Sequence, residues 1–163
     1  MPFYHKLGNV PAKRHTIFKN GEQLYNEQLF GTIGFDGMST LLYHVHRPTQ
    51  VKEIISSIDV SPKIAVAKNI ASRKLISFDV ASKEDFLEAR EPLLVNNDVH
   101  VGVAAPKKSL KDYFYKNADA DEMLFIHRGS GTLRTLVGNI PFEYGDYLII
   151  PRGMIYQIDF DTE

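Results

Sequence analysis

Short runs of β-branched and aromatic residues recur along the chain, and this pattern constrains its fold more than any other feature. In the first half the runs cover residues 24–30, 40–45, 64–67 and 75–80. In the second half they cover residues 99–104, 123–127, 132–137, 147–150 and 155–160. Residues 128–131 and 138–139 are typical of tight turns between antiparallel strands. The pattern predicts an all-β fold, a sandwich or a jelly-roll barrel.

One short helix is predicted between the two series of strands. Ser82 can cap its first turn, Asp85 completes a box-like start, and Glu84 favours the positive helix N-terminus. Residues 86–89 supply a short apolar stripe, and Pro92 ends the helix. We expect a helix of two to three turns, as about 3.6 residues make one turn.

The first twenty residues differ from the rest in charge. They contain four cationic residues, Lys6, Lys13, Arg14 and Lys19, and no acidic residue. Pro and Gly residues in the same stretch disfavour a helix. We predict an extended basic arm over residues 1–20, lying on its own barrel or on a neighbouring subunit, and one β domain over residues 21–163.

Composition excludes several classes of protein. The 19 Lys and Arg residues against 20 Asp and Glu residues give a net charge of −1, so neither nucleic acid nor a membrane surface is an expected partner. With no cysteine, the chain has no thiol nucleophile, cysteine zinc site or iron–sulfur cluster. No apolar run has the 18 or so residues of a membrane span. Residues 1–6 contain no apolar h-region, so we do not expect a signal peptide there. We expect a cytoplasmic protein.

Two residue spacings sharpen the prediction of a barrel. Glu122 is followed by Gly129 after six intervening residues, and Gly145 is followed by Pro151, Gly153 and Tyr156. These spacings resemble the two motifs of the cupin jelly roll, in which three histidines and a glutamate converge on one metal ion. The glycines permit tight turns, and proline closes a strand where no backbone N–H is needed.

The metal ligands of that pattern are missing here. Counted back from Glu122, the first two histidine positions hold Tyr115 and Asn117, and the last one holds Tyr156. Glu122 alone cannot hold a divalent ion tightly. We therefore predict no metal site, and a packed interior in which internal hydrogen bonds satisfy the tyrosine hydroxyls.

The remaining histidines and acidic residues can be explained by a structural role as well as by a functional site. His44 and His46 are two residues apart in a predicted strand, and with His100 or His127 they could form a second metal site. Packing or a subunit contact explains the pair as well. The acidic residues at 119, 121 and 122 fit an exposed turn. The chain has no G-x-S-x-G elbow, H-E-x-x-H pair or P-loop, so no catalytic or cofactor-binding residue is assigned.

Several blocks of sequence resemble the N-terminal end of bacterial homogentisate 1,2-dioxygenases. They cover residues 1–8 with 14–15, 42–46 with 48–49, 121–131, 138–141, 145–147, 150–153 and 156–157. The resemblance implies a cytosolic iron(II) enzyme of tyrosine and phenylalanine catabolism that opens the ring of homogentisate with O2 to give maleylacetoacetate. It also implies a homo-oligomer, a trimer that can pair into a hexamer.

In that family the iron is held by two histidines and a glutamate of the C-terminal domain, and the N-terminal cupin half is a metal-free scaffold. No residue of this chain matches an iron ligand of the family. We therefore expect a portion truncated at its C-terminus relative to the family and inactive by itself. The alternative is a free-standing, non-enzymatic cupin in which Tyr115, Asn117, Glu122 and Tyr156 line a pocket for a small ligand, or which serves assembly only.

Overall fold

The computed structural model describes residues 19–48 and 50–161, and these residues form strands joined by turns and loops. The first strands are β1 (Lys19–Asn20), β2 (Gln23–Leu24), β3 (Asn26–Ile33), β4 (Asp36–His44), β5 (Arg90–Val95) and β6 (His100–Ala104). They are followed by β7 (Leu110–Lys116), β8 (Glu122–Phe125), β9 (Gly131–Thr135), β10 (Gly138–Phe142), β11 (Tyr147–Ile150) and β12 (Ile155–Phe160). The prediction of an all-β chain is confirmed.

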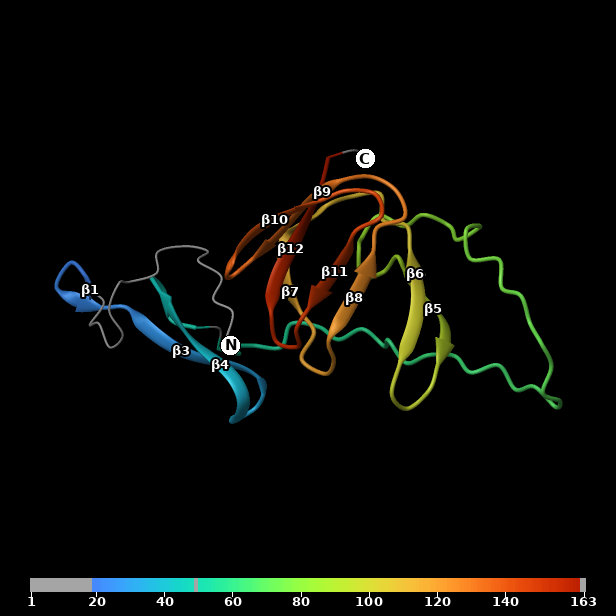
Figure 1. The fold of residues 1–163 in the computed structure, drawn as a ribbon, viewed down its shortest axis with the longest axis horizontal. Coiled ribbons are helices and arrows are strands. Elements are labelled where there is room, and N and C mark those ends of the chain that lie inside the picture. The colour runs from blue at the N-terminus through green and yellow to red at the C-terminus, as the bar shows by residue number, and fades with distance from the viewer. Residues whose placement is uncertain (1–18, 49, 162–163) are drawn as a thin grey trace.

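The main body is a four-stranded antiparallel sheet in the order β10-β9-β12-β7, with the β11–β8 pair beside it (Figure 1). Alternate residues of β12 and β11 point into the space between these sheets, as the two-residue period of a strand requires. Tyr156 and Ile158 are each 1% exposed. They belong to one core cluster, which also contains Phe86, Leu110, Leu133, Phe142, Leu148, Ile150 and Met154.

The sheets of the described residues do not close into a barrel. The strand pairs β11–β8, β5–β6 and β3–β4 are each separate two-stranded sheets. The jelly-roll topology therefore stays a prediction, although the turns that its motifs require are present. Gly129, Gly145 and Gly153 all have positive φ angles, of 85°, 94° and 84°, which favour glycine.

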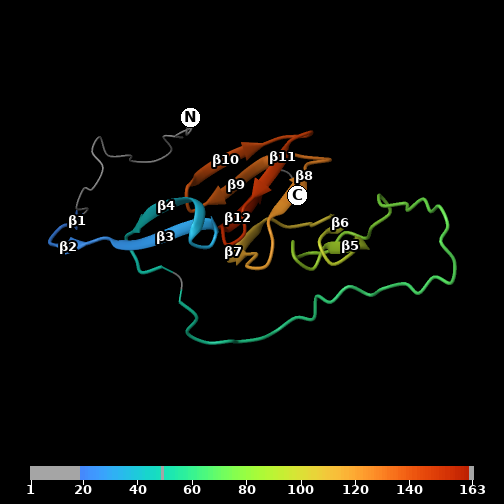
Figure 2. The same ribbon diagram turned by 60° about the horizontal axis from the view of Figure 1, so that its bottom comes forward.

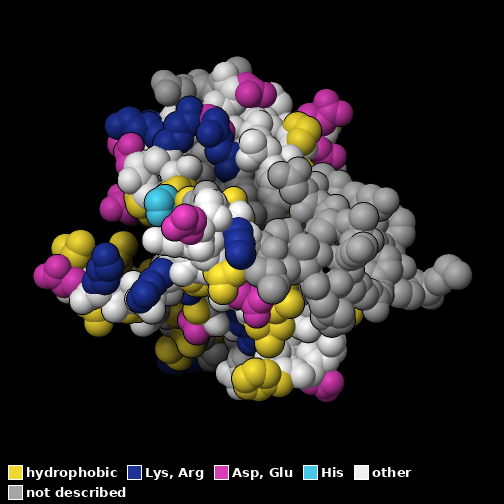
Figure 3. Space-filling view, turned by 90° about the vertical axis from the view of Figure 1, so that its left-hand side faces the viewer, with side chains coloured by type: hydrophobic (Ala, Val, Ile, Leu, Met, Phe, Trp, Pro, Cys, Tyr) yellow, Lys and Arg dark blue, Asp and Glu magenta, His cyan; other side chains and the backbone are white. Residues whose placement is uncertain are grey.

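The β3–β4 hairpin extends from one side of the body. Its strands pair from Asn26↔His44 to Ile33↔Asp36, and Gly34 takes a φ of 61° in the turn. Phe30 packs against the core cluster. Figure 3 looks onto the side where this hairpin lies, and hydrophobic side chains are open to solvent there among charged ones. Those of the hairpin include Leu29, Ile33, Phe35, Met38 and Leu41.

A long connection leads from β4 to β5 and contains no strand between residues 50 and 82. It runs outside the body in both ribbon views (Figures 1 and 2). The predicted strands at 64–67 and 75–80 are therefore wrong for the isolated chain. Their residues have strand-forming side chains, but a strand also needs a neighbouring backbone to bond to, and no described strand pairs with them.

The predicted helix at residues 82–92 is also wrong. Residues 86–89 form a single turn, in which the Ala89 N–H donates to the Asp85 carbonyl oxygen at 2.9 Å. Asp85 rather than Ser82 caps it, because its Oδ1 accepts the backbone N–H groups of Leu87 and Glu88. The apolar stripe is real, with Phe86 at 5% and Ala89 at 0% exposure. The chain then enters β5, where pairing with β6 overrides the weak helical preference.

Pro92 lies inside β5 instead of ending a helix, next to a register shift in the β5–β6 pairing. Such an irregularity is where a strand tolerates a residue without an N–H. The runs of predicted strand also missed β7 and β10. In β7, Lys111, Asp112 and Lys116 interrupt the apolar pattern, and β10 begins with the Gly138–Asn139 pair that was predicted as a turn.

Most of the predicted arm, residues 1–18, lies outside the described residues. Its last two residues form β1 and pair with β2. The division into an arm over 1–20 and a domain over 21–163 stays a prediction. Within residues 19–48 and 50–161, no helix is long and apolar enough to cross a membrane.

Candidate functional site

The most concentrated polar cluster of the interior joins an arginine, a glutamate and a tyrosine. The Arg90 Nη1 donates to Glu122 Oε1 at 2.5 Å, and its Nη2 donates to the Tyr156 hydroxyl at 3.0 Å. The Tyr156 hydroxyl in turn donates to Glu122 Oε2 at 2.7 Å. Each of the three side chains therefore contacts both of the others, and both carboxylate oxygens have a donor.

Four strands bring these groups together. Arg90 begins β5, Glu122 begins β8, and Tyr156 lies on β12 directly opposite Tyr115 of β7. The two tyrosine rings meet edge to face, with centroids 5.4 Å apart. The arginine carbon Cζ lies 4.6 Å from the ring centroid of Phe86 and 5.0 Å from that of Tyr115. Aromatic faces therefore flank the guanidinium, an arrangement that stabilises a cation.

Burial makes this cluster electrostatically strong. The Glu122 side chain is 9% exposed and that of Arg90 30% exposed. Burial raises the pKa of the Tyr156 hydroxyl; the Arg90 charge opposes this rise and the Glu122 carboxylate adds to it. Burial by itself lowers the pKa of Arg90, but Tyr156 and Glu122 outweigh it and raise that pKa above its ordinary value. At neutral pH the cluster is a half-buried ion pair bridged by the neutral, buried phenol of Tyr156.

Iron does not fit this donor set. The one carboxylate that the cupin pattern supplies, Glu122, already has the guanidinium on one oxygen and a hydroxyl on the other. The positive charge of Arg90 beside it would repel a divalent ion. Asn117 does not face the cluster: its Oδ1 accepts the backbone N–H groups of Asp119 and Ala120 in the β7–β8 loop.

The comparisons with known proteins decide the family. Residues 5–163 match the family described as homogentisate 1,2-dioxygenase N-terminal. The chain belongs to this family. It is also 34% identical, over 162 residues, to a protein of Saccharolobus solfataricus named "Putative dioxygenase". That match covers 98% of this chain but 42% of the relative, so the chain spans less than half of the relative's length. No solved structure matches the chain.

Membership of the homogentisate 1,2-dioxygenase N-terminal family agrees with the resemblance seen in the sequence. Of the four positions at which a ligand was considered, Tyr115, Glu122 and Tyr156 come together, and Asn117 does not. The expected internal hydrogen bonding of the tyrosines is confirmed at Tyr156. No buried side-chain nitrogen or oxygen lacks a partner in the part of the chain that the structure describes.

Sequence reasoning missed Arg90, the central residue of the cluster. It lies just before the predicted end of the helix at Pro92, and no role was predicted for it. A glutamate in the interior without a metal does require a cationic partner, but nothing in the sequence distinguishes Arg90 from the other Lys and Arg residues.

The histidines of this family member do not form the second metal site that was considered. His44 Nε2 shares a hydrogen bond with the Gln28 Oε1 across the β3–β4 pair at 2.8 Å. His127 lies among aromatic rings, stacked on Phe78 with centroids 4.6 Å apart. Among the described residues, no group of three or more His, Cys, Asp or Glu side chains could hold a metal ion. His46 is exposed just after β4, and His100 begins β6.

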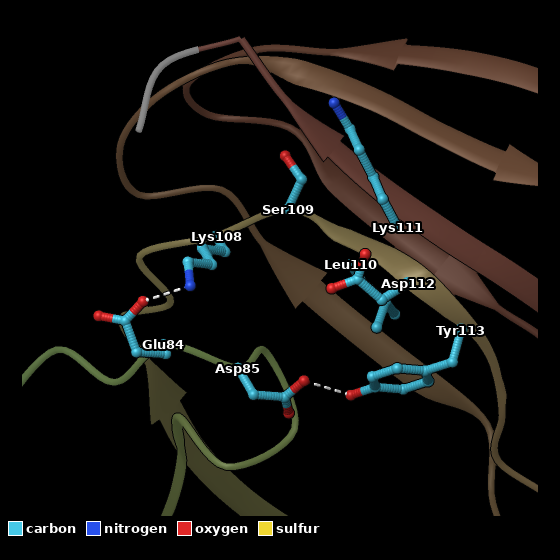
Figure 4. A pocket seen from close by; sticks show the side chains of 8 residues that line it. All are labelled: Glu84, Asp85, Lys108, Ser109, Leu110, Lys111, Asp112 and Tyr113. Carbon is cyan, nitrogen blue, oxygen red and sulfur yellow. Dashed lines mark hydrogen bonds and ion pairs between the residues drawn. The ribbon is translucent and has the colours of Figure 1, made fainter.

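A shallow pocket lies beside the first half of β7, lined by residues 84–85 and 108–113 (Figure 4). Its charged groups pair with one another: Glu84 accepts from Lys108 at 2.9 Å, and Asp85 Oδ2 accepts the Tyr113 hydroxyl at 2.5 Å. Lys111 of the lining pairs with Asp159, which lies outside the pocket. Most of the charged groups are therefore already paired, and we assign no ligand to this pocket. Of the acidic run, Asp119 and Asp121 lie in an exposed loop as expected, whereas Glu122 turns inward.

Proposed function

We propose that this chain is the metal-free N-terminal cupin portion of a homogentisate 1,2-dioxygenase. The whole enzyme would open the ring of homogentisate with Fe(II) and O2 to give maleylacetoacetate, in tyrosine and phenylalanine catabolism. The metal would be held outside residues 1–163. Scaffolding and subunit contacts would be the role of this portion, in a cytoplasmic homo-oligomer.

The observation that carries this proposal is the Arg90–Glu122–Tyr156 cluster. A guanidinium takes the electrostatic place that a metal has in other cupins, so the strands are joined by a fixed internal cation. An ion pair of this kind favours one arrangement of its elements, because any other leaves a buried charge without a partner. The cluster would thereby fix the starts of β5, β8 and β12 relative to one another, as a scaffold requires.

Oxygen uptake tests the proposal directly. The purified chain is supplied with Fe(II) and homogentisate in an oxygen electrode, and bound iron is measured after gel filtration. We expect neither uptake above the iron-only blank nor stoichiometric iron. Homogentisate-dependent uptake by this chain would contradict the assignment as a metal-free portion.

The same preparation separates the scaffold from a ligand-binding cupin. Calorimetric titration of homogentisate into the metal-free chain should give no heat of binding, because the polar groups of the interior already bond to one another. Saturable binding that Tyr156→Phe abolishes would favour the non-enzymatic alternative.

A further inference from the structure

The outer face of the β8–β11 pair is apolar and uncovered. Leu148 and Ile150 of β11 point into the core, so the side chains between them point the other way. This outer face consists of Met123, Phe125, Tyr147 and Ile149, which are 68%, 48%, 62% and 70% exposed. They are paired across the two strands, Tyr147↔Phe125 and Ile149↔Met123. Strands that are apolar on both sides are typical of sheets covered on both sides.

A second uncovered apolar element lies on the connection between β4 and β5. Residues 63–76, called the basic segment from here on, carry Ile64, Val66, Ile70, Leu75 and Ile76, all exposed. Ile70 is 108% exposed and Val66 96%. The sequence of this segment predicts strands at 64–67 and from 75 onward, yet it has no strand partner within the described chain.

The charges of the two elements are complementary. The basic segment contains Lys63, Lys68, Arg73 and Lys74 and no acidic residue. The outer face has acidic residues at both ends, since Asp119 and Asp121 precede β8 and Glu143 and Asp146 precede β11, its antiparallel neighbour. These four outnumber the nearby cations, Arg128 and Arg152. Residues 63–68 consist of four apolar residues between two lysines. This arrangement of charge is complementary to that of the outer face, which is apolar between two acidic ends.

We propose that the basic segment docks on the outer face of the β8–β11 pair of a second copy of this chain. The outer face of the same chain is poorly placed to bind the segment. Phe78, just beyond the segment, is held at the rim of its own face by stacking on His127. From there the basic segment runs away from β8 and β11, past β5 and β6, in both ribbon views (Figures 1 and 2).

The area available suits a stable contact. An apolar side chain buries about 60–120 Å² if burial is worth 1.5–3 kcal/mol at 25 cal/mol per Å². Nine such side chains, five on the segment and four on the face, give roughly 500–1,100 Å² for one contact. Each copy offers one segment and one face, so a reciprocal pair would bury about 1,000–2,200 Å², which spans the usual size of a specific interface.

Sedimentation velocity of matched variants tests this contact. The chain is expected to associate at concentrations up to about 100 μM. Ile64→Asp with Val66→Asp on the segment, or Ile149→Asp on the face, should weaken association at least about tenfold. Val51→Asp with Ile55→Asp is the control, because these side chains are equally exposed on the same connection but outside the segment. A chain that is monomeric throughout, or a control as damaging as the test variants, would overturn the proposal.

Disulfide trapping then separates a second copy from the same chain, and the absence of cysteine makes the experiment clean. Val66→Cys and Ile149→Cys are made in separate chains and mixed under mild oxidation. We expect a mixed product of twice 18.5 kDa. Val51→Cys mixed with Ile149→Cys should give none. If one chain carrying both Val66→Cys and Ile149→Cys instead closes internally and stays at 18.5 kDa, the segment belongs to its own face and the proposal is wrong.

Discussion

The body formed by β7–β12 and the region formed by the β3–β4 hairpin and the following connection use similar apolar residues very differently. In the body, Leu133, Leu148 and Ile158 are at most 6% exposed. In the other region, Ile33, Ile55 and Val66 are at least 64% exposed. The difference lies in the number of layers. The body has two sheets that cover each other, whereas among the described residues no second sheet covers the hairpin or the connection, which contact the body only locally, through side chains such as Phe30 and Phe78.

This contrast shows that strand-forming sequence does not by itself make a stable strand. A two-stranded ribbon is only marginally stable in water unless a further layer covers it. An exposed apolar surface of this extent is typical of a surface that contacts another protein part. The body therefore holds the fold of the isolated chain, and we expect the other region to be the part that a partner would cover.

A large effect is expected from breaking the ion pair of the body. Glu122→Ala leaves the half-buried Arg90 charge without its carboxylate, and the Tyr156 hydroxyl without its acceptor. Removing one member of a fully buried pair costs about 3–5 kcal/mol, and since Arg90 is 30% exposed we expect a cost of about 2–3 kcal/mol. Urea unfolding followed by circular dichroism measures the loss. The double variant Arg90→Met with Glu122→Leu removes both charges and should regain most of it. If the free energy of unfolding of Glu122→Ala lies within about 0.5 kcal/mol of the parent value, the ion pair does not hold the strands together.

A matched pair of isoleucines sharpens the comparison. Ile158→Ala in the core, at 1% exposure, should lower the free energy of unfolding by about 2–5 kcal/mol. Ile64→Ala in the connection, at 75% exposure, should change it by less than about 0.5 kcal/mol at concentrations where the chain is monomeric. Equal losses for the two variants would show that the connection is buried within the same chain.

Gly131 tests how closely the body is packed. A Cβ at this position would lie 2.7 Å from the Phe142 ring and closer still to the Asp159 carbonyl oxygen of the paired strand. Gly131→Ala should therefore cost about 1–3 kcal/mol, as forced overpacking does. Ser39→Ala on the exposed strand β4 is the control and should be neutral in the same urea titration. A neutral Gly131→Ala would mean that β9 and β12 separate easily.

The smallest effect is a dependence on pH at the turn before β5. Burial opposes ionisation of Asp85, but the Tyr113 hydroxyl and the N–H groups of Glu88 and Leu87 outweigh it and lower its pKa. A lowered pKa means that the carboxylate stabilises the fold above the unfolded value of about 3.9 and loses this contribution as the pH falls further. Loss of a capping side chain costs about 0.5–2 kcal/mol. Since Asp85 is partly exposed, we expect its contribution to the free energy of unfolding to lie at the low end of this range.

The Asp85→Asn variant keeps the acceptor but has no charge to titrate. Unfolding midpoints in urea, measured at pH 7 and at about pH 3, should fall less for the variant than for the parent. An identical fall in both proteins would assign the acid sensitivity to other carboxylates, such as Asp159, whose pKa is lowered by Lys111 and by Arg134.

The sequence determined the parts of this protein that depend on local chemistry. The period of two residues predicted β11 and β12 to the residue, because their alternate side chains are buried or half-buried. Glycines at 129, 145 and 153 predicted the turns, since their positive φ is a property of single residues. The family, too, was recognised from local blocks of sequence such as residues 121–131 and 150–153, and the family match confirms it.

The tertiary structure decided what depends on residues far apart in the chain. Arg90 reaches Glu122 and Tyr156, which lie 32 and 66 positions away, so no local pattern could reveal that these three side chains bond to one another. The same holds for the turn at 86–89, where pairing with β6 takes over from helix propensity, and for residues 64–67 and 75–80. Their strand propensity is genuine, but a strand is made by hydrogen bonds to a second backbone, and only the arrangement in space determines whether that backbone is there.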